Sequence, residues 1–168
     1  SSSYYRLMIP RLINQARVLY LDADIIVNGS LSDFYYSDLN DAPVGVVKDY
    51  GMGEYFPFPY LDASVSKKYF NSGVLLIDCV KWRNEGLVDT LLQTIEEYGD
   101  QVLYGDQCIL NIVLREKAKY YSFTENAQVQ YIEKIKRERG ITQVNLNIPP
   151  LIIHYAAKHK PWDNHNPT

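Results

Sequence analysis

The stretch Val18-Leu19-Tyr20-Leu21-Asp22-Ala23-Asp24-Ile25-Ile26-Val27 decides the fold of this 168-residue chain. Its first apolar run ends at Asp22, and a second begins directly after Asp24, which is the pattern of a buried strand interrupted by two carboxylates. Open α/β sheets bind their ligands beyond the carboxyl ends of such strands. The stretch therefore predicts a central strand with a ligand site at its end.

Three further strands and three helices are predicted around this stretch. The strands cover Val44 to Lys48, Gly73 to Ile77 and Leu151 to Tyr155. The helices cover Tyr4 to Ile13, Leu87 to Ile95 and Ile109 to Leu114, where apolar residues recur at the helical period, and Asp106 is expected to act as the N-cap of the last. Strands that alternate with helices indicate an α/β domain with a mainly parallel sheet flanked by helices.

Composition narrows the class of protein. The length suits a single domain over residues 1–168. The formal net charge of -3 gives no global attraction to nucleic acid, which is excluded as a partner, and no run approaches the roughly 20 apolar residues of a transmembrane segment. Cys79 and Cys108 lie in apolar runs at no metal or redox spacing, as reduced core cysteines of a cytosolic protein do. We expect a cytoplasmic location, with a peripheral position at the inner membrane as the alternative.

Two segments lack a regular period. Asp49 to Tyr60 is rich in glycine, proline and aromatic residues, which predicts a loop near a site. Ile132 to Arg139 is strongly charged, which is typical of a solvated helix face.

The Asp22-Ala23-Asp24 motif can present hard oxygen ligands to Mg²⁺ or Mn²⁺, and such an ion can bridge the oxygens of a diphosphate. On its own a D-x-D pair is more often part of a turn or of the surface. Here the apolar context favours a site, because two buried carboxylates without a cation repel each other and lose their hydration. A metal-dependent phosphohydrolase that uses Asp22 as nucleophile is the rival interpretation, although such enzymes continue with Gly-Thr rather than with another apolar run.

A second group of polar residues lies near the C-terminus. His154 lies at the end of the apolar run that begins at Leu151, and Lys160-Pro161-Trp162 follows after one loop. A neutral imidazole could complete a Mn²⁺ site begun by the two aspartates, and Lys160 could neutralise a departing diphosphate. A structural histidine, an exposed lysine and an apolar Trp162 plug remain the alternatives.

Five elements, taken in order, resemble the retaining GT-A glycosyltransferases of family 8, the group of bacterial galactosyl- and glucosyltransferases and glycogenin. They are Tyr5-Arg6-Leu7, Val18 to Asp24, Tyr69-Phe70-Asn71-Ser72-Gly73-Val74-Leu75-Leu76-Ile77, Asp106-Gln107 with Ile109-Leu110-Asn111, and His154-Tyr155 through Lys160-Pro161-Trp162. The last matches the H-x-x-G-x-x-K-P-W signature of the family at its ends. The five elements span nearly the whole chain.

The resemblance implies the roles of particular residues toward a UDP-sugar. The metal, normally Mn²⁺ with Mg²⁺ as the alternative, would be held by Asp22, Asp24 and His154. The backbone of Ala23 would approach the ribose, and Lys160 would contact the diphosphate. The donor sugar would be lined by Arg6, Asn71, Gly73 and Asp106, with Asp49 at its outer edge.

The resemblance also implies the reaction, in which a hexose moves from UDP-glucose or UDP-galactose to a saccharide or glycan acceptor with retention of configuration. Gln107 would stand near the anomeric carbon. An amide is a poor nucleophile, so front-face attack is expected, with Asp106 as the fallback nucleophile.

The chain departs from the family pattern in two places. Ala157 stands where the signature has glycine, next to the diphosphate. Ser1 falls in what should be a helix in the middle of the domain, so residues 1–168 are expected to be a partial GT-A domain without the uracil-binding N-terminal portion. Such a chain would have an unpaired sheet edge and could self-associate through it. A non-catalytic truncated remnant is therefore the second alternative.

Overall fold

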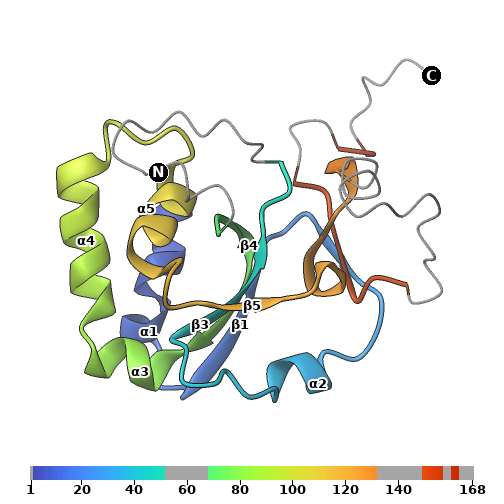
Figure 1. The fold of residues 1–168 in the computed structure, drawn as a ribbon, viewed down its shortest axis with the longest axis horizontal. Helices are drawn as coiled ribbons and strands as arrows, with labels where there is room; N and C mark the ends of the chain where they lie inside the picture. Colours follow the sequence, from blue (N-terminus) through green and yellow to red (C-terminus); the bar gives the residue numbers. More distant parts are fainter. Residues whose placement is uncertain (1, 52–67, 132–148, 157–159, 163–168) are drawn as a thin grey trace.

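The computed structural model describes residues 2–51, 68–131, 149–156 and 160–162, and these form two small sheets with helices beside them (Figure 1). The first sheet has the order β1-β4-β3-β5, from strands Arg17–Leu21, Phe70–Asp78, Val44–Lys48 and Lys119–Tyr121. The second has the order β2-β7-β6, from strands Ile25–Val27, Ile152–His154 and Ala127–Gln128. Each predicted apolar run thus forms a strand, and β5 and β6 are added. The prediction of one central strand around the two aspartates is wrong, because the chain changes sheets at this turn: β1 lies at an edge of the first sheet among the described strands, and β2 belongs to the second.

The prediction of a mainly parallel sheet is wrong for the described strands. The strand β4 runs antiparallel to both β1 and β3, and β2 runs antiparallel to β7, whereas only β3–β5 and β6–β7 are parallel pairs. A parallel sheet needs a crossover connection, usually a helix, between successive strands. Here the helices α3, α4 and α5 follow one another between β4 and β5, so strands and helices do not alternate one by one.

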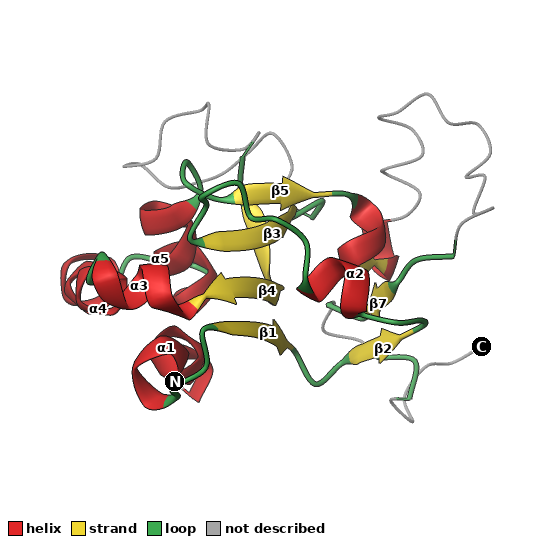
Figure 2. Ribbon diagram, turned by 90° about the horizontal axis from the view of Figure 1, so that it is seen from below, coloured by secondary structure: helices red, strands yellow, loops and turns green. Residues whose placement is uncertain are grey.

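Most helices gather on one side of the first sheet, and the β2–β7 pair and the short helix α2 (Ser32–Tyr35) lie on the other (Figures 1 and 2). The helices of the larger group are α1 (Ile9–Leu12), α3 (Cys79–Asn84), α4 (Leu87–Tyr98) and α5 (Gly105–Leu114), with a 3-10 helix η1 (Ser2–Met8) leading into α1. The helix α2 lies between β2 and β3 in the chain. None of the helices in the described ranges has the length and apolar character needed to cross a bilayer.

The predicted helix ends differ from the observed ones in two places. The segment Tyr4 to Ile13 is mostly 3-10 helix, and only Ile9–Leu12 is α-helical. Asp106 is not the N-cap of α5, because the helix already begins at Gly105, whose φ of 47° is left-handed and easy for glycine. Asp106 therefore lies in the first turn, where its charge suits the positive end of the helix.

The largest core cluster lies between the first sheet and the helices α3, α4 and α5, and a smaller one lies between the same sheet and α2 and β7. The largest fully buried side chain of the first cluster belongs to Trp82, whose indole N–H donates to the carbonyl of Pro43 at 2.9 Å. Cys79 and Cys108 are buried and form no disulfide, as the sequence predicted. Ala157, Ile132 to Arg139 and most of Asp49 to Tyr60 lie outside the described residues.

The Asp22-Ala23-Asp24 turn joins the two sheets. β1 ends at Leu21, opposite Val74 of β4, and the N–H of Asp22 still donates to the carbonyl of Gly73 at 2.8 Å. On the other side, the carbonyl of Asp24 accepts from the N–H of Tyr155 at 3.0 Å, directly after β7. The backbone thus anchors one aspartate to each sheet.

Candidate metal and donor site

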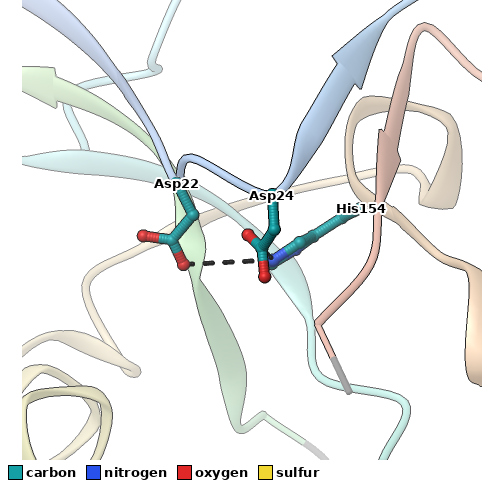
Figure 3. A group of neighbouring side chains, drawn as sticks. All are labelled: Asp22, Asp24 and His154. Carbon is teal, nitrogen blue, oxygen red and sulfur yellow. Dashed lines mark ion pairs between the residues drawn. The ribbon is translucent and has the colours of Figure 1, made fainter. Parts of the chain in front are cut away.

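Three predicted ligands converge at the junction of the sheets (Figure 3). Asp22, Asp24 and His154 each offer one ligand atom, and these atoms all lie within 4.8 Å of one another. His154 Nε2 lies 3.3 Å from Asp24 Oδ1 and 3.9 Å from Asp22 Oδ2. Residues 130 positions apart in the chain therefore meet as two carboxylates and one imidazole, a donor set that suits Mn²⁺.

The protonation of these groups also suits a cation. Burial lowers the pKa of His154, more than the two aspartates raise it, and so favours the neutral ring that can ligate a metal. Burial alone would raise the pKa of Asp24, but the hydrogen bond from Lys160 and the positive charge of its ammonium act against burial, and that pKa is lowered. Asp24 is thus held as a carboxylate beside a neutral imidazole.

Because Gly73 has no side chain, His154 and Asp22 can approach its backbone closely. A Cβ built on Gly73 would lie 2.2 Å from His154 Cε1 and 2.8 Å from Asp22 Oδ2, closer than real Cβ contacts come. Glycine is required here by the close approach of the two ligands rather than by its backbone angles. The predicted position of Gly73 at the site thus has a steric basis.

Arg6 connects the cluster of Asp22, Asp24 and His154, here called the ligand cluster, to Asp106. Its Nη1 lies 3.1 Å from Asp22 Oδ1, and its Nε lies 2.9 Å from Asp106 Oδ2. Its guanidinium also donates to the carbonyl of Ser72 at 2.9 Å and lies over the ring of Tyr20, 4.7 Å from the centroid. The arginine is therefore held in place between two carboxylates at the site.

Lys160 is also drawn to the ligand cluster. Its ammonium lies 2.6 Å from Asp24 Oδ2 and donates to the carbonyl of Tyr155. Trp162 is 57% exposed and packs edge-on against Tyr155, so it is not a buried plug. Ala23 is exposed between the two aspartates, which leaves its backbone open to a ligand.

A second polar cluster lies next to the first. Gln107 Nε2 donates to Asp49 Oδ2 at 2.9 Å, and Gln107 Oε1 accepts from the N–H of Ser72 at 3.0 Å. Asn71 Nδ2 lies 3.3 Å from Gln107 Oε1 and 3.4 Å from Asp49 Oδ2. These side chains open onto a pocket of about 160 Å³. It is lined by Asp49, Gly51, Asn71, Tyr104, Gln107, Gln130 and Ala156.

Some residues of the site were missed by reasoning from the sequence. Asn126 Oδ1, which can only accept, lies 2.8 Å from His154 Nδ1, and the Tyr20 hydroxyl donates to Asp22 Oδ1 at 2.7 Å. Tyr20 could have been found from its place two residues before Asp22 on the strand, where side chains share a face. Nothing in the sequence around Asn126 indicates a contact with His154, because its short 3-10 helix comes to lie beside β7 only in the folded chain.

Comparison with known proteins identifies the family. The sequence model of glycosyl transferase family 8 matches residues 1–166. Glycosyltransferase GlyF of Streptococcus pneumoniae is 34% identical over 165 residues, which are 98% of this chain and 38% of GlyF. The lipopolysaccharide 1,2-glucosyltransferase of Escherichia coli is 30% identical over 163 residues, which are 95% of this chain and 48% of that enzyme.

Solved structures agree with this result. Glycosyltransferase GlyE of Streptococcus pneumoniae superposes with a TM-score of 0.77 at 30% identity, over 98% of this chain and 40% of GlyE. The galactosyltransferase LgtC, solved with donor and acceptor sugar analogues, gives 0.76 at 27% identity, over 97% of this chain and 61% of LgtC. The chain thus spans less than two thirds of the length of each of these proteins. It has the GT-A fold and belongs to glycosyl transferase family 8.

Proposed function

We propose that the full-length protein transfers a hexose from UDP-glucose or UDP-galactose to a saccharide or glycan acceptor, with retention of configuration. The observation that carries the proposal is the convergence of Asp22, Asp24 and His154 at the junction of the two sheets. The relatives supply the two candidate sugars, since one is named a glucosyltransferase and another a galactosyltransferase. A cytoplasmic location, with the inner membrane surface as the alternative, is part of the same proposal.

Asp22, Asp24 and His154 would hold a divalent cation. Carboxylate oxygens suit Mg²⁺ and Mn²⁺ alike, and the imidazole favours Mn²⁺. A cation bound there would neutralise the charge that develops on the diphosphate of the departing UDP. Lys160 would add a second positive charge to the same leaving group, because its ammonium already lies beside Asp24.

The neighbouring polar pocket would hold the donor sugar. Asp49, Asn71 and Gln107 present carboxylate and amide groups to this pocket, and such groups can donate to and accept from sugar hydroxyls. Arg6 links the cation ligands to the helix that carries Gln107, since it pairs with both Asp22 and Asp106. Sugar and diphosphate would thus occupy adjacent parts of one site.

The side chains near the pocket favour a front-face mechanism. A double displacement needs a carboxylate nucleophile near the anomeric carbon. Gln107 is an amide, and Asp106, the fallback nucleophile, is paired with Arg6 at 2.9 Å. The carboxylate of Asp49, which also lines the pocket, accepts from Gln107 at 2.9 Å and is expected at the outer edge of the sugar, away from the anomeric carbon. In front-face transfer the acceptor oxygen bonds to C1 on the face that UDP leaves, the C1–O bond to UDP breaks, and the acceptor proton passes to the departing phosphate oxygen.

The test is a donor screen with the full-length protein. UDP release from UDP-glucose and UDP-galactose would be followed with and without Mn²⁺, and NMR would give the anomeric configuration of the product. We expect Mn²⁺-dependent turnover of one donor and a retained anomer. An inverted anomer would refute the retaining mechanism. Release of phosphate from an aryl phosphate without any sugar would instead identify a phosphohydrolase that uses Asp22, and absence of donor binding would identify a non-catalytic protein.

A further inference from the structure

A chain of buried amide side chains runs from the donor-sugar pocket to His154. Its members are Asn71, which is 7% exposed, and Asn126, which is 0% exposed. Asn126 is the last residue of the 3-10 helix η3 (Phe123–Asn126), and the mechanism above does not use it. Because water hardly reaches these side chains, their donors and acceptors have to be matched by neighbouring groups.

The backbone determines which way the amide of Asn71 points. The N–H of Gly73 can only donate, and its partner at 3.0 Å is Asn71 Oδ1. The other end of the amide, Nδ2, lies 3.4 Å from Asp49 Oδ2, which as a carboxylate oxygen can only accept. Exchanging the two ends would set two donors together at Gly73 and two acceptors together at Asp49.

This orientation determines those of Asn126 and His154 in turn. Asn126 Nδ2 donates to Asn71 Oδ1 at 3.0 Å, so Asn126 Oδ1 is the atom that faces His154 Nδ1 at 2.8 Å. An amide oxygen can only accept, so the hydrogen of the neutral ring is on Nδ1 and the lone pair is on Nε2. Nε2 is the nitrogen that faces the carboxylates of Asp22 and Asp24.

We infer that Asn126 is a positioning residue that holds His154 in the tautomer with its hydrogen on Nδ1, so that the Nε2 lone pair is directed at the cation site. The inference rests on the proposed function, and it deepens it by linking the sugar pocket to the metal ligand through Asn71. Residues that accept a hydrogen bond from the outer nitrogen of a ligating histidine change metal affinity by about 10- to 100-fold when they are replaced.

The first test uses the metal-free wild-type chain and needs no variant. Long-range ¹H–¹⁵N NMR distinguishes a protonated ring nitrogen from a bare one, and the spectrum would be recorded at a pH at which the ring is neutral. We expect the hydrogen of His154 on Nδ1. A hydrogen on Nε2 would overturn the inference, even if Mn²⁺ binds normally. A hydrogen on Nδ1 in a chain that binds no Mn²⁺ would refute the proposed metal site and leave the tautomer assignment standing.

The second test compares variants by calorimetry with Mn²⁺ as the probe. Asn126→Ala should weaken Mn²⁺ binding by roughly 10- to 100-fold and populate the other tautomer. Asn126→Asp keeps an acceptor for Nδ1–H, so it should keep the wild-type tautomer and recover most of the affinity. Asn111→Ala is the matched control, because Asn111 is an equally buried amide that does not contact His154. Wild-type affinity in a folded Asn126→Ala variant would refute the inference, and if that variant does not fold, the wild-type spectrum decides.

Discussion

Asp24 lies between the ammonium of Lys160, at 2.6 Å, and the imidazole of His154, at 3.3 Å. Its side chain is 23% exposed, so it is open to a ligand and yet held by its neighbours. Because Lys160 lowers its pKa, it is ionised at neutral pH, as a metal ligand must be. At the scale of single residues, Asp24 is the most direct test of the proposed cation site.

We expect Asp24→Asn to abolish both Mn²⁺ binding and Mn²⁺-dependent turnover, because an amide has nearly the same shape but lacks the charge that binds a hard cation. Calorimetry with Mn²⁺ and an assay of UDP release would measure the two effects. Asp89→Asn is the matched control, since Asp89 is an aspartate of α4 with a side chain that is 73% exposed and pairs with Arg11. An Asp24→Asn enzyme that still turns over with Mn²⁺ would rule out the metal assignment.

The three predicted ligands could be proposed from the sequence because each borders an apolar run: Asp22 follows one, Asp24 precedes the next and His154 ends a third. Such runs become strands, and polar residues where strands begin or end are candidates for a shared site, which the structure places at the junction of the two sheets. Asn126 could not be found in this way. Its contact with His154 joins residues 28 positions apart and depends on where a single 3-10 turn comes to lie.

At the scale of elements, the buried amide of Asn111 helps to fasten α5 to β4. The side chain of Asn111 accepts from the N–H of Phe70 at 2.8 Å and donates to its carbonyl at 2.9 Å. It also donates to the carbonyl of Gln107, one turn earlier in the helix. The side chain of Asn111 therefore makes the two hydrogen bonds to the backbone of Phe70 that a neighbouring strand would otherwise make.

Asn111→Ala should lower the free energy of unfolding by about 1–3 kcal/mol, because it leaves the buried N–H and C=O groups of Phe70 without this partner. A urea titration would show the loss as a lower midpoint at an unchanged slope. Gln93→Ala, at an exposed amide of α4, should leave the midpoint nearly unchanged. Equal midpoints for Asn111→Ala and the wild type would show that the clamp does not contribute to stability.

Gly73 on β4 allows a second test at this scale. Gly73→Ala should reduce Mn²⁺ affinity, because the new Cβ would lie 2.2 Å from His154 Cε1 and push the ring away from the aspartates. Gly29→Ala is the control, since a Cβ there would meet only Leu151 Cδ1, at 3.3 Å, near the start of β7. Calorimetry with Mn²⁺ would compare them. Unchanged affinity in Gly73→Ala would mean that the site has more room than the structure shows.

The direction of the strands was the part of the fold that the sequence could not provide. The apolar runs mark β1, β3 and β4 as strands, but a run reads the same in either direction, and the pairing depends on the connections. Here β4 lies between β1 and β3 and runs antiparallel to both, a direction that its own apolar run does not reveal. The helix Leu87–Tyr98 was easier to predict, because its apolar face and the glycines at its ends are local features.

At the scale of the whole molecule, β1 is an edge of the first sheet within the described residues, since its only strand partner there is β4. An edge strand presents backbone N–H and C=O groups that can pair with another chain. We predict that the 168-residue chain self-associates as its concentration rises. Sedimentation velocity over a range of concentrations would show this as a growing fraction of larger species.

A control distinguishes edge pairing from association through exposed side chains. Tyr36 is 77% exposed and lines the same surface pocket as Leu19 and Leu21 of β1. Tyr36→Ser should therefore leave the association unchanged if the backbone edge causes it. A chain that stays monomeric at every concentration would contradict the prediction, and a monomeric Tyr36→Ser variant would assign the association to the side chains.

The place of the Asp22-Ala23-Asp24 turn has a mechanical consequence. Asp22 is tied to Gly73 of the first sheet, whereas Asp24 is tied to Tyr155 beside the second, and His154 belongs to the second sheet itself. An ion bound by all three would link the first sheet to the second. Because the ion would bind only while the two sheets are packed together, its binding would stabilise the folded chain against their separation. Amide hydrogens of β2 and β7 would then exchange more slowly with solvent once manganese is added.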